Sequence, residues 1–354
     1  MRKVSLDKCI AGMELGKTIY SDGGAILLTQ GMILKQSYID RLMLCSISEI
    51  YIQDELSKDI EIKDIISERT RIEAKILVKN LMEEFKKKSR FNADGAKAIV
   101  DCMLDELLTT KDIMINLSDI KATDDYTFSH SVNVCILSLI TGVKIGLNQL
   151  RIRDLGVGAL LHDIGKITIP EELLKKPCKL TSEEYEIVKQ HTVSGFNILK
   201  SDINISTTSA YVAFGHHERY DGSGYPNGAK GDEIHQFARI VAIADVFDAM
   251  TSDRVYRKKF KTHEAAEYLT TASDQLFDPE ILQCFIKNIA YYAIGTTVLL
   301  NTGEKGIVVD CNSSFTTRPI IRIIYNSKGD KVKNYEEIDL TKRLNIFIID
   351  TCEI

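Results

Sequence analysis

The spacing of apolar residues changes along the chain, and each change marks a segment of different predicted structure. Near the N-terminus two short apolar runs, 17–20 and 25–29, flank a turn that contains Gly-Gly. Such a turn adopts positive φ at little cost, so the pattern predicts a hairpin. A helix over 37–44 and a strand over 49–52 are expected to follow. Residues 1–55 therefore predict a small α/β module.

Between residues 56 and 115 the chain becomes charged, and its apolar positions take the period of a helix. Ala74, Leu77, Leu81 and Phe85 recur three or four residues apart, which places them on one face of a helix. We expect this segment to be a helical connector. The period does not separate a face that pairs two chains from one packed within a single chain, so a homodimer stays open.

Residues 116–290 are predicted as a run of helices. Asn148 is expected to cap one of them, because its side chain can accept from a free backbone N–H of the first turn. Thr181 and Glu184 have the spacing of a capping box, which begins another helix. The predicted helices cover residues 127–146, 148–165, 181–195 and 240–250.

After residue 290 the pattern becomes that of short strands. Apolar runs alternate with turns, which predicts a small antiparallel β module over 291–354. The whole chain is thus predicted to be mainly α, with an all-α domain between a small α/β module and a small β module. The predicted C-terminal strands cover residues 296–300, 307–310, 319–325 and 331–335.

Composition narrows the class of protein. The 354 residues are 44% hydrophobic and 27% charged, with a net charge of −5, which excludes a mostly disordered chain and argues against a duplex nucleic acid partner. The longest apolar run, 132–143, falls short of the roughly 20 residues that span a bilayer. Charges also interrupt the N-terminus before any signal-length apolar stretch. We therefore expect a cytoplasmic protein with no membrane span, whose scattered cysteines are buried or inert thiols.

Histidines and carboxylates form one ordered series in the helical segment. A single histidine on an apolar helix would more often be a core residue, so the joint pattern carries the interpretation. Helices that converge on a core can project such side chains toward one point. One catalytic ion takes about three protein ligands, so this set predicts two ions with Asp163 as the bridge. The series is His130, His162, Asp163, His191, His216, His217 and Asp245.

The nature of the ligands limits the metal. Imidazole and carboxylate without thiolate suit iron, manganese or zinc better than copper(I) or an iron–sulfur cluster. The expected cofactors are two divalent ions per chain, with iron or manganese favoured.

Three motifs carry a resemblance to a known family. Residues 162–166 read HDIGK, which resembles the metal signature of the HD phosphohydrolase superfamily. Residues 216–218 read HHE and 221–226 read DGSGYP, which resembles its HD-GYP subfamily. The resemblance covers roughly residues 120–260, and 251–257 is similar to the family's usual close. It implies an all-α domain with two or three metals that hydrolyses cyclic dinucleotides, chiefly cyclic di-GMP.

The chain departs from the family pattern at one position. Members that hold three metals have a glutamate four residues before the first histidine ligand, where this chain has Tyr126. Asp124 and Asp125 precede it, but on a helix they would point elsewhere. We therefore expect two metals. The resemblance associates such a centre with opening cyclic di-GMP to linear pGpG, and further cleavage to GMP stays open.

The expected mechanism uses a hydroxide that bridges the two ions, with in-line attack on the phosphate and loss of the ribose 3′ oxygen. Lys166 lies one turn after Asp163 and is assigned to a phosphate oxygen as a catalytic and binding residue. Arg254 and Arg257 would hold the second phosphate, and Asp248 would orient a ligand histidine or the loop. The resemblance adds a loop at the substrate. The expected substrate-binding residues are Lys166, Gly222, Gly224, Tyr225, Pro226, Arg254 and Arg257.

Two other functions stay open. The substrate could be a different cyclic dinucleotide, such as cyclic GMP-AMP. The chain could also be a non-hydrolytic sensor or interaction protein that binds a cyclic dinucleotide. Loss of a metal ligand would favour the sensor, and none is lost in this sequence. The resemblance makes Tyr225 a candidate to pack against a guanine.

Overall fold

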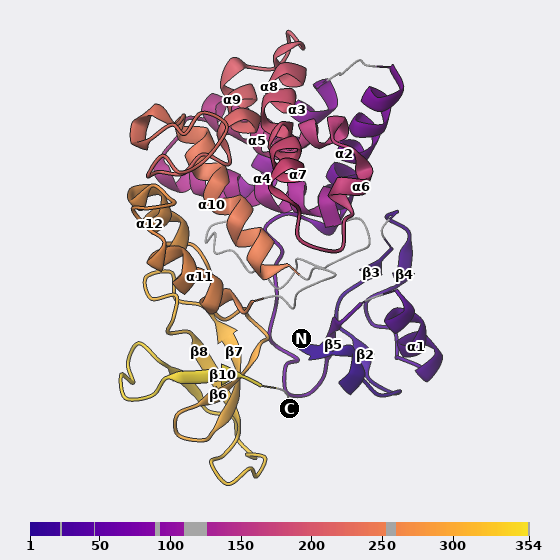
Figure 1. Cartoon of the computed structure of the whole chain (residues 1–354). Coiled ribbons are helices and arrows are strands. Elements are labelled where there is room, and N and C mark those ends of the chain that lie inside the picture. Colours follow the sequence, from indigo (N-terminus) through magenta and orange to yellow (C-terminus); the bar gives the residue numbers. More distant parts are fainter. Residues whose placement is uncertain (22, 46, 89–92, 110–125, 253–259, 353–354) are drawn as a thin grey trace. The chain divides into compact units, whose positions relative to one another are not determined.

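The computed structural model describes residues 1–352, apart from 22, 46, 89–92, 110–125 and 253–259 (Figure 1). They form two compact units, which we call the helical unit and the mixed unit. The helical unit comprises the described residues within 65–109 and 126–286, and the mixed unit comprises those within 1–64 and 287–352. This confirms the predicted mainly α fold with two small flanking modules.

The helical unit contains the whole histidine series. Helix α4 packs on α5 and α10, α9 packs on α5, α8 and α10, and α2 and α3 pack on α4 and α5. Its elements are α2 (Glu68–Lys88), α3 (Asp94–Thr109), α4 (Tyr126–Ile145), α5 (Gln149–Leu160), η3 (Ile164–Thr168), α6 (Glu171–Leu174), α7 (Ser182–Lys189), α8 (His191–Lys200), α9 (Thr207–Gly215), η4 (Gly231–Glu233), α10 (Gln236–Thr251), α11 (Thr262–Thr271) and α12 (Pro279–Lys287).

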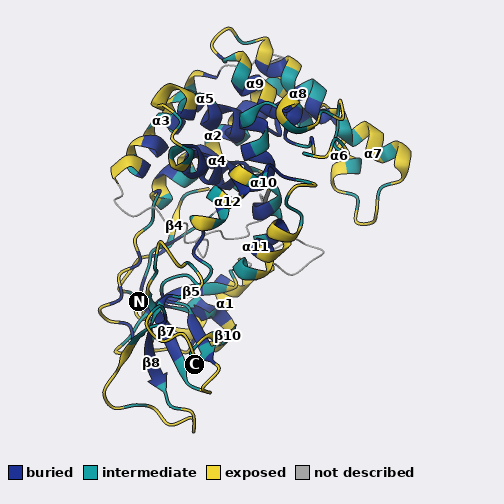
Figure 2. Ribbon diagram, turned by 90° about the vertical axis from the view of Figure 1, so that its left-hand side faces the viewer, coloured by how far each residue is buried: buried dark blue, intermediate teal, exposed yellow. Residues whose placement is uncertain are grey.

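Helices α4 and α10 form the centre of this unit, and Figure 2 shows both largely buried. Within α4, Thr127–Ile145 is long and apolar enough to cross a membrane by length and composition. However, 72% of its most apolar window is buried inside the protein. The helix is therefore packed as a core helix, and the histidine near its N-terminal end faces the protein interior.

Two predicted helices end differently in the structure. The prediction of one helix over 148–165 is wrong, because α5 ends at Leu160 and a turn leads into η3. The prediction over 181–195 is also wrong, because Gln190 ends α7 and precedes α8. Both breaks lie next to a histidine of the series. A period of apolar residues does not record the first break, since buried residues continue from α5 into η3. At the second break the exposed helix α7 meets the partly buried helix α8, and Gln190 between them keeps an α-region backbone.

The predicted caps are confirmed. The side chain of Asn148 accepts from Arg151 N at 2.9 Å. Thr181 and Glu184 form the reciprocal hydrogen bonds of a capping box. These contacts satisfy N–H groups that have no partner within the helix, and they fix where α5 and α7 begin.

The mixed unit contains three sheets. Its N-terminal sheet has the order β1-β5-β2, a hairpin pairs β3 with β4, and the C-terminal antiparallel sheet has the order β10-β6-β7-β8-β9. The elements are β1 (Arg2–Ser5), η1 (Leu6–Lys8), β2 (Glu14–Leu15), β3 (Ile19–Tyr20), β4 (Ile26–Leu28), α1 (Gln36–Leu44), β5 (Glu49–Gln53), β6 (Thr297–Leu300), β7 (Lys305–Asp310), β8 (Ile320–Tyr325), β9 (Glu337–Asp339) and β10 (Ile348–Thr351).

One predicted C-terminal strand is misplaced. Residues 331–335 form only an isolated bridge from Lys331 to Tyr325, and β9 is the strand that pairs with β8. Ile338 in β9 packs against the buried residues of this sheet, whereas 331–335 is mostly exposed. Partial burial of Ile338 against this core therefore favours the paired segment, and a local run of mixed residues does not reveal it.

The N- and C-terminal segments share one core within the mixed unit. Tyr51 and Ile60 pack in the same buried cluster as Ile307 and Ile324. Arg322, whose side chain is only 9% exposed, donates to Asp59 at 2.6 Å through each of two nitrogens and to Glu337 at 2.6 Å. Burial of shared apolar surface joins the two ends of the chain, and Arg322 fixes their register.

We expect Arg322→Met to destabilise the mixed unit by about 1.5–3 kcal/mol at pH 7, because charge-assisted hydrogen bonds are lost. The hydrogen bonds from Arg322 lower the pKa of Asp59 from 3.8 to about 2. Their stabilisation is therefore present above the usual pKa and is lost as the pH falls toward 2. Urea unfolding, followed by hydrogen exchange of β8 amides, would measure the free energy of unfolding of the wild type and the variant at pH 7 and again near pH 2. Arg343→Met, at an exposed arginine, is the control, and equal effects of the two variants would contradict this account.

Candidate metal centre

Asp163 lies in the turn between α5 and η3, with imidazoles on both sides. It is 2% exposed. Its Oδ2 lies 3.4 Å from His162 Nε2, and its Oδ1 lies 3.6 Å from His191 Nε2 and 3.8 Å from His216 Nε2. Asp163 Oδ1 and His162 Nε2 are buried and have no hydrogen-bond partner among the described residues. These atoms surround a point that a shared cation would satisfy.

Backbone carbonyls decide which ring nitrogen of each histidine faces Asp163. In His162, His191 and His216, Nδ1 lies 2.8, 2.6 and 3.0 Å from a backbone oxygen about one turn earlier. Since a carbonyl oxygen only accepts, Nδ1 carries the proton and Nε2 keeps its lone pair. The local helical structure thus presents three ligating atoms toward one carboxylate.

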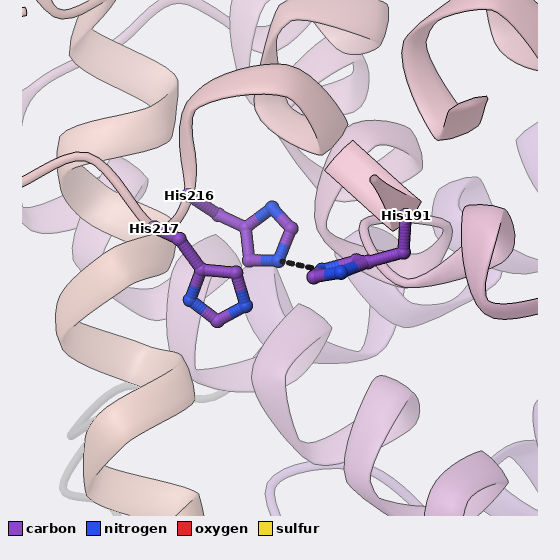
Figure 3. A group of neighbouring side chains, drawn as sticks. All are labelled: His191, His216 and His217. Carbon is purple, nitrogen blue, oxygen red and sulfur yellow. Dashed lines mark hydrogen bonds between the residues drawn. The ribbon is translucent and has the colours of Figure 1, made fainter. Parts of the chain in front are cut away.

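Three histidines form the first group of potential ligands (Figure 3). The ligating atoms of His191, His216 and His217 lie within 4.8 Å of one another. Burial lowers the pKa of His191, and it lowers that of His216 well below the usual value. Burial also lowers the pKa of His217 to about 4. All three rings are therefore neutral at pH 7, which is the form that binds a metal.

The second group comprises His130, His162 and Asp245, whose ligating atoms also lie within 4.8 Å of one another. His130 Nε2 lies 3.0 Å from Asp245 Oδ1, and His130 Nδ1 lies 2.7 Å from Asp248 Oδ2. Burial alone would lower the pKa of His130, but hydrogen bonds to these two carboxylates raise it to about 10. The two carboxylates thus favour positive charge at this position, and a bound cation would supply the same charge.

Asp248 holds His130 in place from the side away from the cluster. It is fully buried, and its other oxygen accepts from Asn133 Nδ2 at 3.0 Å and from Ser252 Oγ at 3.3 Å. Sequence analysis assigned Asp248 such a role but missed Asn133. The available signal was spacing, because Asn133 lies three residues after His130 and hence on the same face of α4.

Asp163 connects the two groups. A third set of ligating atoms within 4.8 Å of one another consists of His162, Asp163 and His216, which overlaps both groups. Imidazole and carboxylate donors of this kind suit a divalent transition metal. The unpartnered buried atoms and the donor set together fit divalent cations, and one carboxylate oxygen is directed to each side.

Residues predicted to contact substrate lie beside this cluster where the structure describes them. Lys166 Nζ donates to Asp163 Oδ2 at 2.5 Å, and 31% of its side chain is exposed. The Tyr225 ring lies 4.9 Å from the His217 ring and 6.5 Å from the His191 ring, measured between centroids. Gly222, Gly224 and Pro226 lie in the same loop as Tyr225, whereas Arg254, Arg257, Asp124 and Asp125 lie outside the described residues, as does the side chain of Tyr126.

Helix α7 contributes side chains that sequence analysis did not assign. The ring of Tyr185 lies 6.1 Å from that of Tyr225. The ammonium of Lys189 lies 5.4 Å from the Tyr185 ring and 5.6 Å from the Tyr225 ring. Lys189 precedes His191 by two residues, and this proximity to a predicted ligand was the only signal for it.

Comparison with known proteins agrees with this geometry. Residues 116–281 match the family described as HD domain, and residues 297–354 match the KOW domain associated with HD domain. The cyclic di-GMP phosphodiesterase PA4108 of Pseudomonas aeruginosa is 31% identical over 267 residues, which cover 75% of this chain and 64% of that protein. A cyclic di-GMP phosphodiesterase of Thermotoga maritima is 42% identical over 184 residues, which cover 52% of this chain and 50% of that protein.

A solved structure shares the fold. Bd1817, an HDGYP protein from Bdellovibrio bacteriovorus, superposes with a TM-score of 0.51 at 17% identity, over 80% of this chain and 97% of that one. Residues 116–281 of the chain therefore form an HD domain. Its HDIGK and DGSGYP motifs place it in the HD-GYP branch, which confirms the resemblance. The chain spans 64% and 50% of the lengths of the two enzymes above.

Gly165→Ala should disturb the centre without changing any predicted ligand. A Cβ at residue 165 would lie 1.9 Å from His191 O and 2.6 Å from Gly195 N, so η3 and α8 must separate. We expect loss of bound metal and destabilisation of about 1–3 kcal/mol, since overpacking forces backbone shifts. Metal analysis and thermal unfolding would measure both effects. Gly23→Ala is the control, because its Cβ would meet no atom within 4 Å and its φ is not positive. Wild-type metal content in Gly165→Ala would refute the prediction.

Asp248→Asn should weaken metal binding through His130. The amide keeps the size of the side chain but offers His130 Nδ1 a weaker, uncharged acceptor. Changes to groups that orient a metal ligand typically cost about 10–100-fold in affinity, and we expect a loss in this range. Competitive titration with a chelator would measure it. Asp278→Asn, at a buried carboxylate bound to Arg239 at 2.7 Å, is the control. An unchanged affinity in Asp248→Asn would show that the contact is only structural.

Proposed function

We propose that the chain is a metal-dependent phosphodiesterase that hydrolyses cyclic di-GMP to linear pGpG. The observation that carries this proposal is the buried carboxylate of Asp163, which lies between two groups of imidazoles with its Oδ1 unpartnered among the described residues. The names of the relatives support the substrate, and the HD-GYP motifs support the reaction class.

The ligands divide between two divalent ions. His130, His162 and Asp245 would hold one ion, and the three neutral histidines 191, 216 and 217 would hold the other, with Asp163 shared. The ions, for which we propose iron or manganese, would lower the pKa of water and stabilise negative charge on the phosphate. Four protein ligands around each ion leave room for oxygen ligands from water or substrate.

The remaining side chains position the substrate. Lys166 is partly exposed, so its ammonium can reach from Asp163 to a phosphate oxygen, where its charge offsets the negative charge of the transition state. Tyr225 borders the cluster and would contact a nucleotide base through its ring. Arg254 and Arg257 would hold the second phosphate. These contacts would align the scissile bond with the attacking water, which is the main contribution of the protein to phosphoryl chemistry.

The finer assignments remain predictions. Cyclic GMP-AMP has the same two phosphodiester links as cyclic di-GMP, so the substrate test must include both. A homodimer and a cytoplasmic location stay predictions from the sequence. The division into modules 1–55, 56–115, 116–290 and 291–354 likewise stays a prediction from the sequence.

Turnover and metal content test the proposal together. Protein loaded anaerobically with Fe²⁺ or Mn²⁺ should convert cyclic di-GMP to pGpG and hold two ions per chain. Asp163→Asn should lose metal and reduce activity more than about 100-fold, because a shared ligand is removed. Asp232→Asn, at a carboxylate whose side chain is 91% exposed, should leave both unchanged. If metal-loaded protein binds cyclic di-GMP but does not hydrolyse it, the proposal of an enzyme is wrong and the chain is a sensor.

A further inference from the structure

Glu218 follows His216 and His217 directly, but its carboxylate is directed into the next loop. The residue is 5% exposed. Its Oε1 accepts from the backbone N–H of Asn227 at 2.8 Å, and its Oε2 accepts from that of Ala229 at 3.1 Å. Each oxygen therefore has its own backbone donor. A buried carboxylate with two such bonds connects the start of the loop to its far end.

The loop 219–230 is folded back over Glu218. A Cβ at residue 224 would lie 2.3 Å from the backbone nitrogen of Arg219, so only glycine permits this close approach. The N–H of Tyr225 also donates to His217 O at 3.2 Å. The loop is thus attached both to the side chain of Glu218 and to the backbone of the residue before it.

These contacts determine where Tyr225 lies. Its ring is 4.9 Å from the ring of His217 and 6.5 Å from that of His191. The geometry points to Glu218 as a positioning residue, which holds the loop so that Tyr225 forms a wall of the substrate site beside the metal centre. Glu218 itself touches neither ions nor substrate. This role rests on the proposed function, and it concerns recognition of the nucleotide rather than cleavage of the bond.

Glu218→Gln tests the role with little change in size. One oxygen becomes an NH₂ group that faces a backbone donor, so one hydrogen bond is lost and a repulsion replaces it. We expect the KM for cyclic di-GMP to rise about tenfold, as expected for loss of one charge-assisted hydrogen bond. The kcat and the metal content should stay within about twofold, because the reacting centre is unchanged.

Glu233→Gln is the matched control. Glu233 is exposed and, among the described residues, accepts one backbone N–H, from Lys230 at 3.0 Å, so its amide can rotate to keep that bond. We expect wild-type kinetics for this variant. An unchanged KM in Glu218→Gln would overturn the inference. A variant that loses bound metal and also has a much lower kcat would overturn it too, since Glu218 would then act through His217.

Hydrogen exchange of the wild-type protein tests the hydrogen bonds of this loop without an activity assay. The amides of Asn227 and Ala229 should exchange slowly, although Asn227 is exposed, and they should exchange faster in Glu218→Gln. Trypsin should also cleave the variant faster after Arg219. Fast exchange in the wild type would overturn the role of Glu218 even if the enzyme is active. Slow exchange without hydrolysis of cyclic di-GMP would instead overturn the proposed function alone.

Discussion

The candidate site depends on the buried carboxylate of Asp163. Among the described side chains its cationic partner is Lys166, and the other groups around it are imidazoles. Burial of Asp163 would be costly in isolation, and its position is enforced by the chain around it. Gly165 lets η3 approach the backbone of His191 within a distance that no Cβ would permit. Carbonyl groups at helix ends then direct the imidazole Nε2 atoms toward the carboxylate. The helical unit thus builds a cation site from backbone geometry as much as from ligand identity.

Sequence reasoning recovered the helical class, the caps at Asn148 and Thr181, and the set of residues that meets around Asp163. Capping needs particular side chains at particular spacings. The residues around Asp163 were predicted from the joint pattern of histidines and carboxylates and from the HD-GYP motifs, and their role as metal ligands stays a prediction. Sequence reasoning missed the early end of α5, since buried residues continue from α5 into η3. It also missed the break at Gln190, where the backbone stays in the α region. It also missed Asn133: the spacing from His130 places Asn133 on the same face of α4, but its contact with Asp248 joins helices that are distant in sequence.

The mixed unit shows the same limit at a larger scale. Periodicity predicted separate modules at the two ends of the chain. In the structure, Ile60 and Ile324 belong to one buried cluster, and Arg322 binds Asp59 across the join. Such pairing arises only when two segments separated by the whole helical unit fold together. A pattern read within either segment therefore indicates its strands but not its partner.

The central claim is that Asp163 is shared by two cations. Anomalous scattering from crystals of manganese-loaded protein tests this most directly. The account predicts two peaks about 3.5–4 Å apart, both within ligating distance of Asp163, with His130 and Asp245 on one and His191 and His217 on the other. A single peak, or peaks that lie beyond the reach of Asp163, would contradict it.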